Sequence, residues 1–246
     1  MAGVAPGHAM GAGEGVSGRL YGIGVGPGDP ELLTLKAVRL VATVSVVAYL
    51  ALEEGDSFAR AIVAAHLPQG VREIVLRVPM SPDPLAAIAA YDRGADLIAA
   101  ELAAGRDVAV PCQGDPVLYG SFMYLHQRLA NRFPVEIVPG ITSLTAAAAA
   151  SGRPPVSRNE SLAVVPAPLD EEVLAERLAD ADAAVVLKVG RHLAKLRRVL
   201  DRIGRAEEAV YVERATLPEQ RIAPLAEAPA EAPYFSLILL PGRGRR

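Results

Sequence analysis

Short apolar runs rich in β-branched residues alternate along the chain with segments that have a helical pattern. The runs predict nine strands, at residues 20–25, 44–49, 73–78, 108–112, 135–138, 162–165, 184–188, 209–212 and 235–240. Further helices are predicted at residues 32–40, after Pro139-Gly140 through 146–150, at 171–178 and at 192–203. Strands that alternate with helices in this way are typical of an α/β fold.

The clearest helical pattern lies between Asp83 and Gly105. Its apolar residues recur every three or four positions and therefore share one face: Ile88, Tyr91, Ala95, Ile98 and Leu102. Gly105 suits the C-terminal cap, because glycine adopts the left-handed conformation without strain. The helix at 32–40 is expected to start just past Asp29-Pro30, since proline is tolerated in a first helical turn.

The pattern and composition predict two α/β domains, at residues 18–139 and 140–246. The stretch before them, residues 1–17, is rich in Gly and Ala and is expected to be a disordered tail. Two prolines and a glycine at 151–157 predict a connection close to the domain boundary. With 246 residues, 51% of them hydrophobic, the chain can bury a substantial core without disulfides.

Composition and charge exclude several classes of protein. The single cysteine, Cys112, forms no internal disulfide, so the cytoplasm is the default compartment. No Lys or Arg precedes Arg19, and no run of about 20 apolar residues occurs, so neither a secretory signal nor a membrane span is expected. A net charge of -3 argues against a broad nucleic-acid surface. The histidines are scattered, so no metal site is expected.

Three loops that contain glycine each follow a predicted strand, where α/β sheets bind their ligands. They read Gly-Ile-Gly-Val-Gly-Pro-Gly-Asp-Pro at 22–30, Cys-Gln-Gly-Asp-Pro-Val-Leu-Tyr-Gly-Ser at 112–121 and Val-Pro-Gly-Ile-Thr-Ser at 138–143. The first is no dinucleotide fingerprint, because its third glycine position holds Pro27 or Asp29. Asp29, Thr142 and Ser143 are equally suited to capping helices.

Taken together and in order, the three loops resemble those of the tetrapyrrole methylases, and the resemblance spans about residues 19–240. Within that family the chain is most similar to the precorrin-2 C-20 methyltransferases of cobalamin synthesis. The blocks that carry this closer similarity are 114–125, 188–192 (Lys-Val-Gly-Arg-His), 211–216 (Tyr-Val-Glu-Arg-Ala-Thr) and 232–237 (Ala-Pro-Tyr-Phe-Ser-Leu). Gln113 departs from the pattern, in which an acidic residue precedes Gly-Asp-Pro.

The resemblance implies a two-domain fold of the class III methyltransferase type with a ligand cleft between the domains. It implies S-adenosylmethionine as methyl donor, a tetrapyrrole acceptor methylated at the C-20 meso carbon, and a homodimer. The residues expected to line the donor site are Pro27, Gln113, Gly114, Asp115, Leu118, Thr142, Ser143, Val189 and Ala215.

Two further sets of residues are candidates for contact with the acceptor. A tetrapyrrole precursor carries carboxylate arms, which suit the planar guanidinium of Arg153, Arg158, Arg191 or Arg214. Tyr119 is the candidate catalytic side chain, as a polar group near the reacting carbon. The alternative role of Tyr119 is packing, with its hydroxyl in a hydrogen bond.

Other functions remain open on the sequence alone. The chain can be a methylase of another corrin-ring position or of the cobalt-loaded substrate, because such enzymes share every feature of the donor loops. A non-catalytic tetrapyrrole- or nucleotide-binding protein is a second alternative, against which the intact loops argue. A nicotinamide-dependent dehydrogenase is disfavoured by the missing fingerprint.

Overall fold

The computed structural model describes residues 17–52, 55–79 and 84–242, so the expected tail lies outside the described residues except for Ser17. The chain forms two compact units. The first holds the residues up to Ile23, then Lys36–Cys112 and Ser121–Val138; the second holds Gly24–Leu35, Gln113–Gly120 and Pro139–Arg246. This grouping differs from the expected domains in two loops, at 24–35 and 113–120, which belong to the second unit.

The first unit contains a five-stranded sheet in the order β3-β2-β4-β1-β5. Its strands are β1 (Leu20–Gly24), β2 (Val46–Ala51), β3 (Arg72–Arg77), β4 (Val108–Cys112) and β5 (Val135–Val138). The registers of β1 with β5 and of β2 with both β3 and β4 are parallel. All five residues of the central strand β4 are buried, as expected for a parallel strand covered on both faces.

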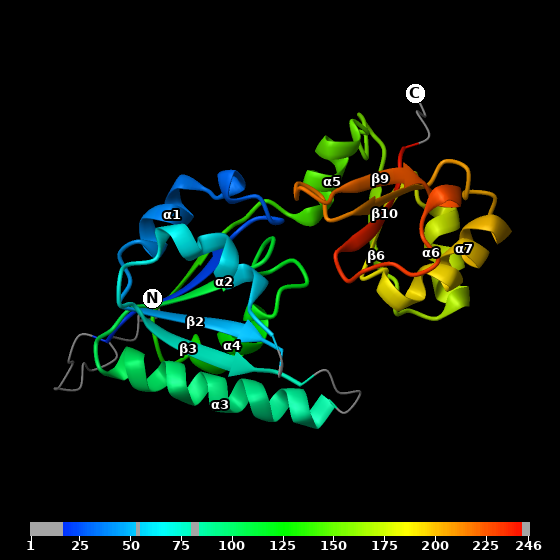
Figure 1. The fold of residues 1–246 in the computed structure, drawn as a ribbon. Coiled ribbons are helices and arrows are strands. Elements are labelled where there is room, and N and C mark those ends of the chain that lie inside the picture. Colours follow the sequence, from blue (N-terminus) through cyan, green and yellow to red (C-terminus); the bar gives the residue numbers. More distant parts are fainter. Residues whose placement is uncertain (1–16, 53–54, 80–83, 243–246) are drawn as a thin grey trace, which may run out of the picture. The chain divides into compact units, whose positions relative to one another are not determined.

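Helices cover both faces of this sheet, as Figure 1 shows. The helices of the first unit are α1 (Leu35–Val41), α2 (Phe58–Val63), α3 (Pro84–Ala103) and α4 (Phe122–Leu129), with a 3-10 turn η2 at Ala64–His66. One face packs against α3 and α4, where Ile98, Leu102 and Phe122 are fully buried. The helices α1 and α2 lie on the other side of β2 and β3 from α3 (Figure 1).

The second unit contains a mixed sheet in the order β6-β7-β10-β8-β9. Its strands are β6 (Leu162–Pro166), β7 (Ala183–Leu187), β8 (Val210–Glu213), β9 (Arg221–Pro224) and β10 (Ser236–Leu240). The pair β6 and β7 is parallel, whereas β10 runs antiparallel to β7 and β8, and β9 antiparallel to β8.

Three longer helices pack on this second sheet. They are α5 (Ser143–Ser151), α6 (Glu171–Asp180) and α7 (Leu193–Arg202); the 3-10 turns are η1 (Pro30–Leu32), η3 (Gly190–His192) and η4 (Leu225–Glu227). The alternation along β7 shows the layering: Val186 faces the cluster of α6 and α7, whereas Val185 faces α5. The buried guanidinium of Arg205 donates to the carbonyl oxygens of Leu178 and Ala181, both at 2.8 Å, which satisfies acceptors at the end of α6.

All nine predicted strands are present, each within two residues of its expected ends. The helix expected between Asp83 and Gly105 is α3, and Gly105 has a φ of 76°, the left-handed value expected of a cap. The helix expected at 32–40 was placed too early. The chain forms the separate turn η1 after Asp29, becomes extended at Leu33, and begins α1 only at Leu35.

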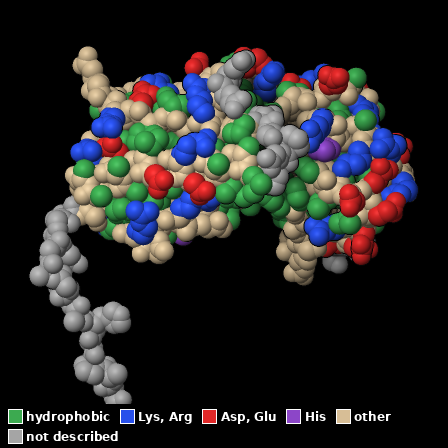
Figure 2. Space-filling view, turned by 90° about the horizontal axis from the view of Figure 1, so that it is seen from below, with side chains coloured by type: hydrophobic (Ala, Val, Ile, Leu, Met, Phe, Trp, Pro, Cys, Tyr) green, Lys and Arg blue, Asp and Glu red, His purple; other side chains and the backbone are tan. Residues whose placement is uncertain are grey.

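The surface in Figure 2 bears Lys and Arg side chains interspersed with Asp and Glu, with no broad region of one sign on the face it shows. Exposed ion pairs occur in both units, such as Arg60 with Glu73 at 2.7 Å and Arg202 with Glu172 at 2.8 Å. None of the helices in the described ranges has the length and apolar character needed to cross a bilayer.

Candidate functional site

Three loops of the second unit meet through their glycines. Gly26, after β1, and Gly114, after β4, form a short antiparallel bridge: the Gly114 N–H donates to the Gly26 carbonyl at 2.7 Å and the reverse bond is 3.3 Å long. Both glycines have positive φ, 77° and 69°, a conformation that other residues adopt only with strain. Two loops of similar sequence are therefore joined backbone to backbone.

The third loop packs against the same point through Gly140. A Cβ built on Gly140 would overlap the carbonyl oxygen of Gly114 and the Cα of Gly24, and a Cβ on Gly24 would overlap the backbone of Gly140. Glycine at these positions allows three backbones to come into contact, which no larger residue permits. We call Gly24, Gly114 and Gly140 the glycine junction.

Both carboxylate oxygens of Asp115 accept hydrogen bonds that stabilise the glycine junction. Oδ1 accepts hydrogen bonds from the backbone N–H groups of Val117 and Leu118, at 2.9 and 3.3 Å, which closes the turn after Gly114. Oδ2 accepts from the N–H of Gly140 at 3.1 Å, across 25 residues of sequence. Asp115 was expected to bind the donor directly; its described partners are backbone groups, and it is absent from the residues that line the pocket.

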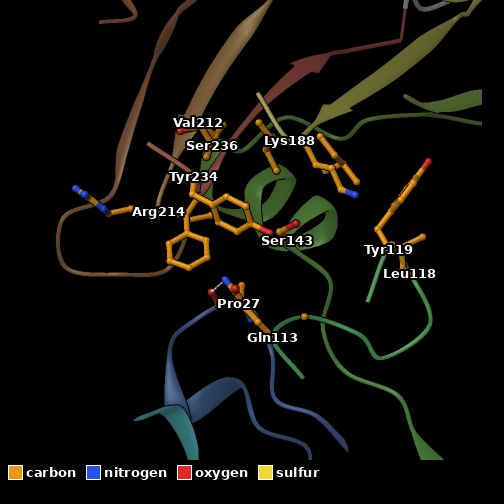
Figure 3. Close-up of a pocket in the computed structure, with 15 residues that line it drawn as sticks. Pro27, Gln113, Leu118, Tyr119, Ser143, Lys188, Val212, Arg214, Tyr234 and Ser236 are labelled. Carbon is orange, nitrogen blue, oxygen red and sulfur yellow. Dashed lines mark hydrogen bonds between the residues drawn. The ribbon is translucent and has the colours of Figure 1, made fainter. Parts of the chain in front are cut away.

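A pocket opens beside the glycine junction within the second unit, and Figure 3 shows its walls. It is lined by the loops after β1 and β4, the first residue of α5, the end of β7 with the residue after it, β8 with the residues after it, and β10 with the residues before it. These residues are Pro27, Gln113, Gly114, Leu118, Tyr119, Ser143, Leu187, Lys188, Val212, Arg214, Ala215, Tyr234, Phe235, Ser236 and Leu237. The Gln113 Nε2 donates to the Pro27 carbonyl at 3.4 Å, the dashed line in Figure 3, and so links the first two loops.

Six of the nine residues expected at the donor site line this pocket, and Asp115, Thr142 and Val189 do not. The Thr142 side chain accepts from the Thr145 N–H and caps α5, the structural alternative stated for it. The side chain of Val189 is fully buried in the core with α6 and α7, because it follows β7 on its inward face. Only its backbone is left for a ligand, and its carbonyl already accepts from the His192 N–H at 2.7 Å.

Tyr119 and Lys188 face each other across the pocket from two different loops. The Lys188 Nζ lies 5.3 Å from the centroid of the Tyr119 ring, a cation–π distance, and Figure 3 shows the lysine pointing toward the ring. The Tyr119 hydroxyl donates to the carbonyl of Val164 in β6 at 3.4 Å. This contact agrees with the packing role stated as the alternative for Tyr119, and its catalytic role stays a prediction.

Backbone strain is concentrated around the pocket. Among the described residues, five other than glycine have positive φ, and three of them line the pocket: Tyr119 at 55°, Lys188 at 59° and Arg214 at 47°. Each such residue costs about 1–3 kcal/mol, and they cluster at ligand sites because the surrounding structure holds side chains in place for binding. The pocket thus has the local signature of a functional site.

Of the four candidate arginines, Arg214 alone lines the pocket. Its Nη1 lies 3.2 Å from Glu213 Oε1, and in Figure 3 its guanidinium extends away from the other labelled side chains. Arg153, Arg158 and Arg191 are exposed and do not contribute to the pocket wall. These three arginines could therefore contact an acceptor only if the acceptor extended beyond the pocket.

A hydrogen-bonded network runs from Ser236 in the pocket wall to the buried Tyr211 behind it. The Tyr211 hydroxyl donates to Glu213 Oε2 at 2.9 Å and lies 3.1 Å from the Ser236 hydroxyl, which donates to the Pro233 carbonyl. Burial, and then the bond to Glu213, raises the pKa of Tyr211 to about 12. Tyr211 is therefore neutral at physiological pH and holds Glu213, the partner of Arg214.

Residue-by-residue assignment from sequence missed half of the pocket wall. The blocks at 188–192, 211–216 and 232–237 carry Lys188, Val212, Tyr234, Phe235, Ser236 and Leu237, but the resemblance assigned no contact to them. The signal that could have found Lys188 is chemical: it is a cation directly after a buried strand. Among the described residues, no group of three metal-binding side chains occurs.

Comparison with known proteins identifies the family. The model of the tetrapyrrole (corrin/porphyrin) methylases matches residues 19–229. The chain is a tetrapyrrole methylase. It is 47% identical over 234 residues to a precorrin-2 C(20)-methyltransferase from Sinorhizobium, covering 92% of this methylase and 96% of the relative. A cobalt-precorrin-2 C(20)-methyltransferase from Salmonella typhimurium is 34% identical over 229 residues, with 92% and 97% covered.

The fold of this methylase is likewise that of solved tetrapyrrole methyltransferases. A uroporphyrin-III C-methyltransferase from Thermus thermophilus, solved with S-adenosylhomocysteine, superposes with a TM-score of 0.67 at 30% identity. The superposition covers 91% of this methylase and 97% of that chain. The α/β fold expected from the alternation of strands and helices is thus confirmed, and the structure builds it from two sheets.

Proposed function

We propose that this methylase transfers a methyl group from S-adenosylmethionine to the C-20 meso carbon of precorrin-2, in cobalamin biosynthesis. The observation that carries the proposal is the composition of the pocket beside the glycine junction. Six residues that the family resemblance assigns to the donor lie in one wall with two cations, Lys188 and Arg214, which suit a carboxylated acceptor. The 47% identity to a relative that bears this activity in its name supports the choice of acceptor and ring position.

The pocket wall fits S-adenosylmethionine in chemistry. Pro27, Leu118 and Ala215 offer apolar surface for an adenine ring, whereas Gln113 and Ser143 offer polar groups for ribose hydroxyls or the methionine part. A Cβ built at Gly114 meets nothing within 4 Å, so the loop leaves free space at the point where its backbone lines the pocket. When bound, S-adenosylmethionine supplies a methyl group on an electron-poor sulfonium.

The main contribution of the protein to catalysis is to position the methyl donor and the acceptor relative to each other. The acceptor carbon is a competent nucleophile, so the loops around the glycine junction need to hold donor and acceptor in line and exclude water. Alignment of this kind lowers a barrier by about 7–11 kcal/mol in favourable cases. The Gly26–Gly114 bridge, the Asp115 bonds and the Gln113–Pro27 bond give the donor wall the rigidity that alignment needs.

A proton leaves the acceptor carbon after methylation, to a base or to solvent, and Tyr119 is the candidate polar group near that carbon. Tyr211 is unsuited to accepting the proton, because its pKa is raised to about 12 and its hydroxyl is engaged with Glu213 and Ser236. Substitution of Tyr119 by phenylalanine, with kcat measured at saturating substrate, separates the two roles. A large loss of kcat assigns proton transfer, and retained kcat leaves only packing.

The proposal includes a homodimer in the cytoplasm, as the family resemblance implies, with no nucleic-acid or membrane partner. Exposed apolar side chains of α3 and α4 in the first unit, among them Ile88, Met123 and Tyr124, support a further protein contact. Light scattering coupled to size-exclusion chromatography measures the mass directly. A monomeric mass across the micromolar range would contradict the dimer and leave the methyl transfer unaffected.

The deciding experiment is product analysis under anaerobic conditions. The purified protein is incubated with S-adenosylmethionine that carries a labelled methyl group and with precorrin-2, in parallel with its cobalt complex. We expect a product one methyl heavier, with the label at C-20 by NMR. A label at another carbon would keep the family and overturn the ring position, and the faster substrate decides between the metal-free and the cobalt-loaded route. No transfer to either compound would overturn the proposal.

A further inference from the structure

Lys188 is a pocket cation without a described anionic partner. The chain has only three lysines, and the other two are engaged: Lys36 is paired with Glu136, and the Lys195 Nζ donates to the Leu169 carbonyl at 2.5 Å. For Lys188 no carboxylate lies within ion-pair distance in the described part of the chain, and its side chain is exposed at the pocket. Its charge is therefore available to a ligand.

Two features hold this ammonium in place without neutralising it. Lys188 and Tyr119 both have a left-handed backbone conformation, with positive φ. In this conformation the Lys188 Nζ lies 5.3 Å from the centroid of the Tyr119 ring. A cation–π contact orients an ammonium and leaves its charge intact. The Tyr119 hydroxyl, bonded to Val164 of β6, fixes the ring in turn.

The second pocket cation, Arg214, differs from Lys188 in having a carboxylate partner. Its guanidinium lies 3.2 Å from Glu213, whose side chain is only 12% exposed and is also held by Tyr211. The charge of Arg214 is thus matched within the protein, whereas that of Lys188 is not. A carboxylated ligand that enters the pocket gains more from Lys188, because no existing ion pair has to be broken.

We propose that Lys188, presented by the Tyr119 ring, binds a carboxylate of the tetrapyrrole acceptor and so selects carboxylated acceptors. This inference rests on the proposed function and assigns a substrate contact within it. A compact ammonium suits the task, since it can form hydrogen bonds to carboxylate oxygens from several directions. The methyl donor also carries a carboxylate, in its methionine part, so the experiment has to separate the two ligands.

The test compares Lys188→Gln and Lys188→Arg with the wild type, and uses Lys36→Gln as the matched control for the loss of one lysine outside the pocket wall. The affinity for precorrin-2 is measured by absorbance under anaerobic conditions, and that for S-adenosylhomocysteine by calorimetry. We expect Lys188→Gln to weaken precorrin-2 binding about tenfold, the loss expected of one charge-assisted contact, and to leave S-adenosylhomocysteine binding unchanged. Lys188→Arg restores most of the affinity, and Lys36→Gln matches the wild type for both ligands.

Ionic strength supplies a second readout that a merely structural role would not move. The affinity of the wild type for precorrin-2 falls as salt rises, and it falls less steeply in Lys188→Gln, because one attraction between charges is missing. Equal losses for both ligands would assign the lysine to the donor and overturn the inference, as would unchanged precorrin-2 binding. If the wild type methylates precorrin-2 while Lys188→Gln binds it normally, the inference fails and the proposed function stands.

Discussion

The chain contains the tripeptide Gly-Asp-Pro twice, at 28–30 and at 114–116, each time in a loop that follows a strand of the first sheet. The two aspartates accept hydrogen bonds from different kinds of partner. Asp29 Oδ1 accepts from the N–H of Glu31 at 2.9 Å and caps the short turn η1. Asp115 accepts from Val117, Leu118 and Gly140, and so joins its own turn to a loop 25 residues away.

The difference lies in what surrounds the tripeptide. In the second loop the positive-φ glycine is Gly114 itself, directly before the aspartate, whereas in the first loop it is Gly26, two positions before Gly28. Asp115 directly follows a member of the glycine junction and bonds across it to Gly140, whereas Asp29 lies three residues past Gly26 and caps its own turn. The same three residues thus form a local cap in one loop and a tertiary link in the other.

The largest effect that tests this comparison is expected from Gly140→Ala. The added Cβ would overlap the Gly114 carbonyl oxygen and the Gly24 Cα, which are backbone atoms that cannot rotate away. We expect the free energy of unfolding to fall by at least about 3 kcal/mol, and S-adenosylhomocysteine binding to be lost. Chemical denaturation and calorimetry measure the two quantities.

Gly152→Ala is the matched control for the strain of a left-handed glycine. Gly152 caps α5 with a φ of 61°, and a Cβ there meets nothing within 4 Å. Its cost is therefore the conformational strain alone, about 1 kcal/mol, with ligand binding retained. Equal losses of stability in the two variants, with binding kept in both, would show that the glycine junction is not a close backbone contact.

The next effect compares the two aspartates directly. Asp115→Ala removes the acceptor of three backbone N–H groups, one of them in another loop, and we expect a loss of about 2–3 kcal/mol of unfolding free energy. Asp29→Ala removes one local cap and costs about 1 kcal/mol. The binding of S-adenosylhomocysteine falls at least about tenfold in the first variant and stays near the wild-type value in the second.

Asp115→Asn refines this result, because the amide keeps one oxygen as an acceptor and replaces the other by a donor. We expect its stability to lie between those of the wild type and Asp115→Ala. If the two alanine variants behaved alike, the tertiary bond from Asp115 to Gly140 would contribute nothing, and the tripeptides would be equivalent turns.

The same comparison shows what the sequence could predict. The nine strands and the positions of the three loops follow from the apolar pattern, because a buried strand needs apolar residues wherever it occurs. Among the α-helices and strands of the described residues, three were missed: α2 and β9 are short, and β9 is an edge strand that carries Arg221 and Pro224. The third, α4, does carry a helical signal in Phe122, Leu125 and Leu129, which share its buried face.

For the pocket, the family resemblance identified more of the lining residues than the local sequence pattern did. It named Pro27, Gln113, Leu118 and Ala215, which line the wall, but it could not separate side chains that face the pocket from those that face a core. Val189 shows the reason, because it stands next to Lys188 and points the opposite way. The pairing of Lys188 with Tyr119 joins residues 69 positions apart, and no periodicity in either segment encodes it.

The smallest effect concerns Gln113, the residue directly before the second Gly-Asp-Pro, where the family pattern led us to expect an acid. Its Nε2 donates to the Pro27 carbonyl at 3.4 Å and so links the loops that hold the two tripeptides. A glutamate cannot donate when ionised and would set a carboxylate against that carbonyl oxygen.

We expect Gln113→Glu to weaken S-adenosylhomocysteine binding about threefold at neutral pH, as the loss of one long hydrogen bond allows. Gln113→Ala, which removes the donor without adding a charge, should weaken it less. Tighter binding by Gln113→Glu would mean that the bond from Gln113 to Pro27 contributes nothing to the donor wall, and that the Gly26–Gly114 bridge alone joins the two loops.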